Sequence, residues 1–194
     1  MKQNIDVEKL EEFRSFLKNN PDKGKLRLEA RAFYEGQAGR STVHVGPYTL
    51  DGNTVNRETR HYTFPFGAWR EVEETIGVGG PTDRMEPVEM TLAATAACVV
   101  NSISFNAIRM GIDAESFEIH VETVVDPRVL LGVEGPEQHS SCLGTVRYEV
   151  KVRGNVSDEE IDTIRKLCEH SPVHGMLVEP IRVAGKVTRA EPNN

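Results

Sequence analysis

The sequence of 194 residues is poor in cysteine, in aromatic side chains and in basic charge. It has three cysteines, Cys98, Cys142 and Cys168. A small and odd number of cysteines does not indicate a disulfide framework, so we expect a reducing compartment such as the cytoplasm. A net charge of -7 argues against nucleic acid or an anionic membrane surface as the main partner. The first residues mix acidic and basic side chains without an apolar stretch, so we expect no secretory signal.

Only one long run lacks charged residues, from Met90 to Ile108. A run of this length could span a membrane, but its threonines, serines and asparagines favour a buried helix in a soluble core. Apolar side chains lie on nearly every face of this helix, and four alanines leave little bulk around Cys98. A chain of this size has limited material to cover such a helix. We therefore expect a partner subunit, and a homodimer is the commonest solution.

The rest of the sequence predicts an α+β domain. Hydrophobic periodicity and capping signals predict the following elements along the chain, by residue number: a helix capped by Asp6 and ending at 19–21, strands at 26–34, 41–45 and 54–64, a connector at 77–87, the uncharged helix ending at Gly111, a strand at 117–123, a surface loop at 126–144, a strand at 146–152, a helix opened by the capping box Ser157–Glu160 and interrupted at Ser171–Pro172, and a strand at 181–188.

Cys98 is the candidate for chemistry. A free cysteine is often a small buried hydrophobe, and that reading fits an alanine-rich helix. The alternative is a nucleophilic or redox-active thiol stabilised by a nearby arginine or histidine. The residues alone leave both readings open.

The segment from Pro87 to Cys98 reads PVEMTLAATAAC, a proline and an acid followed by a Leu/Ala run that ends in cysteine. It resembles the helix motif of the OsmC/Ohr family, and the order of the surrounding elements agrees from about residue 26 to 187. Residues 25–190 would then form the OsmC-like domain, with residues 1–24 as an N-terminal helical extension. The resemblance implies an OsmC-like fold: antiparallel sheets and two central helices in an intertwined homodimer, with active sites at the subunit interface.

The resemblance also implies an activity. A peroxidatic cysteine reduces an organic hydroperoxide, and a second cysteine resolves the sulfenic acid as a disulfide that an external thiol reductant reopens, without a bound cofactor or metal. Cys98 occupies the peroxidatic position. The resolving position holds Ser171, which cannot form a disulfide, so Cys168, three residues earlier, is the substitute that we expect.

Two further residues are assigned through the resemblance. The family often places its acid directly after the proline, where this chain has Val88, so Glu89 is the expected acid and Glu86 a second candidate. If the helix is continuous, nine residues place Glu89 and Cys98 on opposite faces, and a break or use across the dimer would be needed. Arg40 is the expected partner of the thiolate, with Arg31 as the alternative.

These departures keep a second hypothesis open: a non-catalytic protein that binds a small apolar ligand at the dimer interface. Other patterns are weaker. Cys168, His170 and His174 lack a full zinc ligand set, and a Cys98–His174 hydrolase dyad has no specific support. The run Gly77–Gly80 lacks the context of a phosphate-binding loop and is interpreted as a connector.

Overall fold

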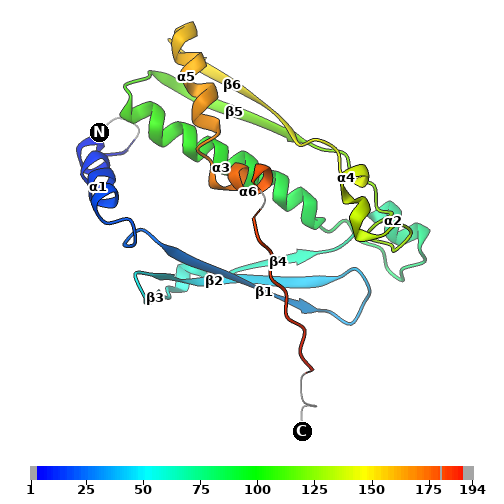
Figure 1. Ribbon diagram of the computed structural model, residues 1–194. Helices are drawn as coiled ribbons and strands as arrows, with labels where there is room; N and C mark the ends of the chain where they lie inside the picture. The colour runs from blue at the N-terminus through cyan, green and yellow to red at the C-terminus, as the bar shows by residue number, and fades with distance from the viewer. Residues whose placement is uncertain (1–3, 180, 190–194) are drawn as a thin grey trace.

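The computed structural model describes residues 4–179 and 181–189. Its long helix α3 (Pro87–Arg109) lies between two layers, as Figure 1 shows. One layer is a four-stranded antiparallel sheet of β1 (Leu26–Tyr34), β2 (Ser41–Leu50), β3 (Asn53–Val55) and β4 (Tyr62–Phe66). The other is the antiparallel pair β5 (Ala114–Glu122) and β6 (Arg147–Gly154) with α5 (Asp158–Cys168). Helices and antiparallel sheets are combined as an α+β fold requires, which confirms the predicted class.

Shorter elements connect these layers. Helix α1 (Val7–Asn19) lies beside the C-terminal end of α3, and α6 (Pro172–Val178) packs on α3 after α5. Helix α2 (Arg70–Thr75) precedes the connector to α3, and α4 (His139–Cys142) lies between β5 and β6. The predicted caps form: the Asp6 carboxylate accepts from the Lys9 amide, and Ser157 with Glu160 makes the capping box of α5.

The core lies on one side of α3. Val99 and Ile103 are fully buried and pack with Ile164, Leu167 and Cys168 of α5. The inward side chains of β5 and β6 close this cluster from the other side, with Phe117, Ile119, Tyr148 and Val150. By length and composition α3 is the one helix among the described residues that could cross a membrane, but this packing makes it a core helix.

Strand β1 of the four-stranded sheet is open on both faces, whereas β2 is mostly half-buried. Every residue of β1 is exposed, including Leu28 at 70% and Tyr34 at 71%. The alternation in this strand predicts one buried face, and no other part of the described chain covers it. The alternation in β1 is typical of a strand with one buried face. In the described chain that face of β1 is exposed to solvent.

The structure corrects several boundaries. The predicted strand 54–64 is two strands, β3 and β4, separated by a 3-10 turn, Glu58–Arg60. The interruption lies opposite Gly46 and Pro47 of β2, where the proline has no amide hydrogen to continue the ladder. The loop 126–144 is not a plain surface loop, because it contains α4 and buries Cys142. Helix α2 had not been predicted.

The predicted last strand is also wrong. Residues 181–189 form no strand in the described chain, and Val183 and Val187 are 93% and 100% exposed. Figure 1 shows this tail leaving α6 and extending past the four-stranded sheet. Periodicity predicts extended backbone correctly here, but a strand also needs a neighbouring edge with which to form hydrogen bonds.

Candidate functional site

Cys98 lies in the middle of α3, where the core face of the helix meets its open face. Its neighbours Thr95 and Val99 are 1% and 0% exposed, whereas Ala94 and Ala97 on the other side are exposed. This division follows from the turn of about 100° per residue in a helix. The thiol is half-buried and makes no hydrogen bond within the described chain. Small neighbours therefore leave it open to a reactant on one side.

The other two cysteines are enclosed. Cys142 is 3% exposed at the end of α4, and Cys168 is 2% exposed at the end of α5. The Cys168 thiol donates a hydrogen bond to the Ile164 carbonyl at 3.4 Å. Burial raises the pKa of the Cys168 thiol above its ordinary value, against smaller opposing effects, first from its own backbone and then from the Tyr148 hydroxyl. Since all three cysteines are described, Cys98 is the thiol that solvent reaches most readily.

A buried hydrogen bond ties the Cys98 segment to α5. Ser102, one turn after Cys98, donates from Oγ to the Leu167 carbonyl at 2.8 Å. Leu167 directly precedes Cys168, so the two cysteines belong to neighbouring turns of packed helices. Their side chains differ in direction: Cys168 points into the core with Val99 and Ile103, while Cys98 lies at the edge of that face. Ser171, at the expected resolving position, is 2% exposed and caps α6 by accepting from the His174 amide.

Arg40 is held by an acid that the sequence analysis missed. Its Nε and Nη2 donate to the two oxygens of Glu73 at 3.3 and 2.9 Å, and Nη2 also donates to the Gly80 carbonyl at 2.7 Å. Glu73 lies in α2 and is 1% exposed, and the Arg40 side chain is 10% exposed. The Thr82 amide donates to the same carboxylate at 2.8 Å. The turn between β1 and β2, helix α2 and the connector are thus joined at one buried ion pair.

The electrostatics of this junction follow from those contacts. The Arg40 hydrogen bond, followed by that of the Thr82 amide, lowers the pKa of Glu73 below its ordinary value despite burial. A second pair lies alongside: Arg84 binds Glu35 at 2.8 Å, and Glu35 also accepts from the Thr42 hydroxyl. These two hydrogen bonds, that of Thr42 first, lower the pKa of Glu35. The lowered pKa values of Glu35 and Glu73 favour the ionised form of both carboxylates.

A sequence signal for Glu73 did exist. Trp69, Val72 and Glu73 occupy the i, i+3 and i+4 positions of one helical face, so a glutamate stands where an apolar residue is expected. A carboxylate at such a position must find a cation or several donors, because burying it unpaired is costly. The neighbouring charged residues Arg70, Glu71 and Glu74 make the segment look solvent-exposed, so the sequence alone does not single out Glu73.

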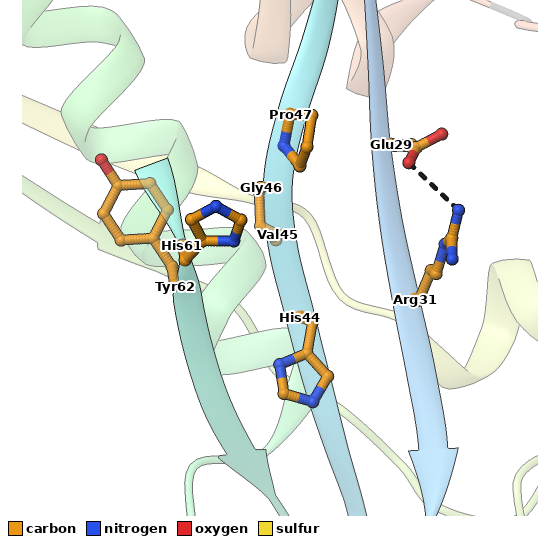
Figure 2. Close-up of a pocket in the computed structure, with 8 residues that line it drawn as sticks. All are labelled: Glu29, Arg31, His44, Val45, Gly46, Pro47, His61 and Tyr62. Atoms are coloured by element: carbon orange, nitrogen blue, oxygen red, sulfur yellow. Dashed lines mark hydrogen bonds and ion pairs between the residues drawn. The ribbon is translucent and has the colours of Figure 1, made fainter. Parts of the chain in front are cut away.

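Arg31, the alternative arginine, lies elsewhere on the sheet. Figure 2 shows it on β1 beside Glu29, to which its Nη2 donates at 3.4 Å, and the side chain is 73% exposed. The two residues border an open hollow of about 220 Å³ on the four-stranded sheet, together with His44, His61 and Tyr62. In the described chain this hollow contains none of the predicted catalytic residues other than the alternative Arg31.

Glu89 is used at the start of α3. Its carboxylate accepts from the Glu86 amide at 2.8 Å, and the Glu86 carboxylate accepts from the Val88 amide, which together form a capping box. The helix runs unbroken from Pro87 to Arg109, so Glu89 faces away from Cys98 within one chain. No hydrogen bond or ion pair of the described residues joins any two of Cys98, Cys168, Glu89 and Arg40. Their roles as a set stay a prediction.

An apolar hollow of about 500 Å³ lies along the N-terminal half of α3. It is lined by residues of α3, of the segments that follow β5 and precede β6, and of the end of α6, among them Thr91, Leu92, Val125, Leu143 and Leu177. Thr91 lies two turns before Cys98 on nearly the same helix face, about 10 Å away along the axis. The volume suits a small apolar molecule.

The histidines near α6 form no metal site in the described residues, where no group of three or more His, Cys, Asp or Glu side chains is arranged to hold an ion. His174 packs edge-on against Tyr148, with Nδ1 at 3.5 Å from the phenolic oxygen. No contact within the described chain joins His174 to Cys98.

Comparisons with known proteins agree with this architecture. Residues 80–185 match the family described as OsmC-like protein, which is more than half of the chain. No curated protein sequence matches the chain. Among solved structures, the chain is similar to an organic hydroperoxide resistance protein from Elizabethkingia anophelis, with 13% identity, a TM-score of 0.53, and coverage of 79% of this chain and 89% of the other. An OsmC-like protein from Mycoplasma pneumoniae gives 14% identity, a TM-score of 0.52, and coverage of 78% and 86%. These likenesses concern the fold.

Proposed function

The chain belongs to the OsmC-like protein family, and on that premise we propose that it is a thiol-dependent peroxidase that reduces organic hydroperoxides through Cys98. The observation that carries the proposal is the position of Cys98. Of the three thiols it is the half-buried one, without a hydrogen-bond partner in the described chain and flanked by alanines, while the other two are enclosed. A peroxidatic thiol needs access as well as a stabilised thiolate.

The reaction balances with two external thiols. The Cys98 thiolate attacks the terminal peroxide oxygen, the O–O bond breaks, and the alkoxide takes a proton and leaves as the alcohol. The sulfenic acid is then attacked by a thiol, which releases water and forms a mixed disulfide. A second thiol displaces Cys98 from that disulfide and restores the reduced enzyme. The net change is one hydroperoxide and two thiols to one alcohol, one water and one disulfide.

The first resolving step has two candidates. Cys168 belongs to the turn next to the Ser102 contact, but its burial and raised pKa disfavour the thiolate that resolution requires. A small thiol that reaches Cys98 from the open face of α3 has no such obstacle. We therefore favour direct reduction by a small thiol, with Cys168 as the alternative that an opening of the α5–α6 junction would allow.

The test is intact mass spectrometry of the fully reduced protein after stoichiometric cumene hydroperoxide. We expect rapid oxidation of the wild type and none of Cys98→Ser, whereas the matched control Cys142→Ser oxidises like the wild type. Gain of one oxygen supports one-cysteine chemistry, and loss of two hydrogens supports a disulfide with Cys168. An unchanged mass for the wild type under these conditions refutes the peroxidase proposal.

We propose further that the protein works as a homodimer in the cytoplasm. Both faces of β1 are open, and Phe105, two turns after Cys98 on α3, is 53% exposed. Apolar surface of this extent on a sheet and a central helix is typical of a subunit interface. Sedimentation equilibrium that gives a monomer at micromolar concentration would contradict the dimer.

The proposed location in the cytoplasm rests on the three free cysteines, which fit a reducing compartment.

A second function is favoured by the apolar hollow beside α3: non-catalytic binding of a small apolar ligand. A fluorescent fatty-acid analogue provides the probe. Leu177→Arg, which places a charge in the hollow, should abolish binding, while Leu130→Arg at a 78% exposed position outside it should not. Binding by a protein whose Cys98 resists hydroperoxide would favour this function over the peroxidase.

A further inference from the structure

The open hollow of about 220 Å³ on the four-stranded sheet arises at a β-bulge. The register of β1 against β2 shifts between Leu28 and Ala30. Glu29 therefore faces two residues of β2, Gly46 and Pro47, where a regular ladder would place one. Because Gly46 carries no side chain, the face of the sheet is left open at this point. We call this space the sheet hollow, and none of the described residues that line it belongs to α3.

Four polar side chains border the sheet hollow, and the strand register explains why they share one face. Arg31 of β1 pairs with His44 of β2, so both side chains point to the same side of the sheet. Glu29, two residues before Arg31, points to that side as well. His61 reaches it from the segment before β4, and its Nδ1 lies 3.5 Å from where a Cβ at Gly46 would be. Figure 2 shows the two histidines along one side of β2 and the Glu29–Arg31 pair along β1 on the other.

Each histidine is held at one ring nitrogen and keeps the other free. Nδ1 of His44 lies 3.0 Å from the Thr63 hydroxyl, and Phe33 packs edge-on against the same ring at 5.5 Å between centroids. Nε2 of His61 lies 3.0 Å from the Asn56 side-chain oxygen. That oxygen only accepts, so Nε2 of His61 carries the proton. The free nitrogens, Nε2 of His44 and Nδ1 of His61, make no hydrogen bond within the described chain.

The net charge of the sheet hollow is set by these two histidines. Arg31 and Glu29 balance each other, and Tyr62 is the remaining titratable side chain on the rim. The ion pair uses a single hydrogen bond at 3.4 Å, so the other N–H groups of Arg31 are unbonded within the described chain. When a histidine takes up a proton, its free nitrogen becomes a charged N–H donor. Protonation thus turns the sheet hollow into a cationic site with donors on two sides.

We propose that the sheet hollow binds the oxyanion group of a small molecule, a phosphate or a carboxylate, through Arg31, His44 and His61. Charged N–H donors form short, strong hydrogen bonds to such oxygens, and an arginine binds two of them at once. The volume is smaller than that of typical pockets for drug-sized ligands, so the bound group is small. This site is separate from the proposed peroxidase chemistry and does not depend on it.

A partner subunit on the apolar side of the sheet would leave this site open. Alternation along β1 places Leu28 and Tyr34 on the face opposite to Arg31. A second copy that covers those apolar side chains therefore leaves the sheet hollow in contact with solvent.

The experiment titrates the full chain with sodium phosphate and, in a second arm, with sodium succinate, at pH 6.0 and at an ionic strength kept constant with sodium chloride. Proton NMR follows the imidazole C–H signals of the six histidines, and His44→Gln and His61→Gln assign the two at the sheet hollow. These two signals should shift and saturate, whereas that of His120, which is 69% exposed on β5, should not. Saturation by phosphate alone, or by succinate as well, identifies the oxyanion. The affinity should fall at pH 8, because histidine ordinarily loses its charge in this range.

Three matched substitutions test the geometry. Arg31→Gln should weaken binding by about tenfold, as expected for the loss of a charge-assisted hydrogen bond. Arg27→Gln removes the same charge from the same strand about 13 Å away, beyond the range of about 10 Å over which charges act at 0.1 M salt. It should change the affinity by less than about twofold. Glu29→Gln should strengthen binding, because the Glu29 carboxylate repels an anion and competes for Arg31.

Three outcomes would overturn the inference. Shifts that grow linearly for all six histidines would indicate a general salt effect without a site. Equal losses of affinity in Arg31→Gln and Arg27→Gln would indicate attraction to a basic surface. Weaker binding by Glu29→Gln would contradict the arrangement in which this acid opposes the ligand. The substituted residues are all exposed, so each variant should fold, and circular dichroism checks that it does.

Discussion

The Cys168 thiol offers a test of whether a buried cysteine can take part in the chemistry. It is 2% exposed, hydrogen-bonded to the Ile164 carbonyl, and burial raises its pKa above the ordinary value of about 8.5. In the unfolded chain the same thiol titrates at that ordinary value. Between the two pKa values the folded protein holds a proton that the unfolded chain has released. Stability is therefore complete below about pH 8.5 and is lost as the pH rises toward the folded pKa.

The size of the effect is set by one proton. Within that window the free energy of unfolding falls by at most about 1.4 kcal/mol per pH unit. With a denaturant slope of about 1–3 kcal/mol per molar, the urea midpoint should fall by roughly 0.5–1.4 M per pH unit. Burial also raises the pKa of Tyr148, so titration of this tyrosine contributes only near pH 10 and above. Urea unfolding followed by circular dichroism at pH 7, 8, 9 and 9.5 covers the window.

The comparison that isolates Cys168 is the difference between wild type and Cys168→Ala at each pH. The one other titration that the substitution changes is that of Tyr148, whose pKa is raised by burial first and by Cys168 in addition, and a fixed protein concentration keeps any subunit association equal. We expect the two midpoints to converge as the pH rises from 8 to 9.5, because only the wild type loses the contribution of the buried thiol. Parallel curves with a constant offset would refute the reasoning, and the argument against Cys168 as a resolving nucleophile would fail with it.

Other predictions follow from single contacts. Ile103→Ala, at a fully buried core position of α3, should lower the free energy of unfolding by about 2–5 kcal/mol, measured by urea denaturation. Ser157→Ala should cost about 1 kcal/mol by removing half of the α5 capping box, and an unchanged midpoint would contradict the cap. Because the pKa of Glu73 is lowered, its contribution to stability is present above about pH 4.3 and lost as the pH falls through the folded pKa. Acid unfolding of Glu73→Gln should lack that part of the transition.

The elements that depend on local signals were predicted well. Caps at Asp6 and Ser157 and the end of α3 near Gly111 all lie where the sequence places them. These features depend on residues within a few positions of one another, such as the positive φ of 78° at Gly111. Local chemistry is sufficient to determine them.

The features that were missed depend on distant partners. The strand at 181–188 failed because alternation says nothing about whether an edge is available. The split between β3 and β4 required knowledge of which β2 residues lie opposite, and Pro47 is one of them. Cys142 was assigned to a surface loop because a glycine- and serine-rich stretch gives no signal of the α4 helix that buries it.

The residues of the candidate site also fall into two groups, those that a local motif identifies and those that depend on distant parts of the chain. A sequence motif identifies Cys98, because the proline, the alanine run and the cysteine are contiguous on one helix. The partner of Arg40 comes from α2, 33 residues along the chain, and pairs with it only because the sheet and the connector fold together there. Chain position gives Glu89 as the expected acid, and that role stays a prediction. Burial identifies Glu73 as the carboxylate that Arg40 binds, since a carboxylate that is 1% exposed must be matched by fixed donors. The exposure of each charged side chain thus shows which residues need a buried partner, and distance along the chain from the motif does not show it.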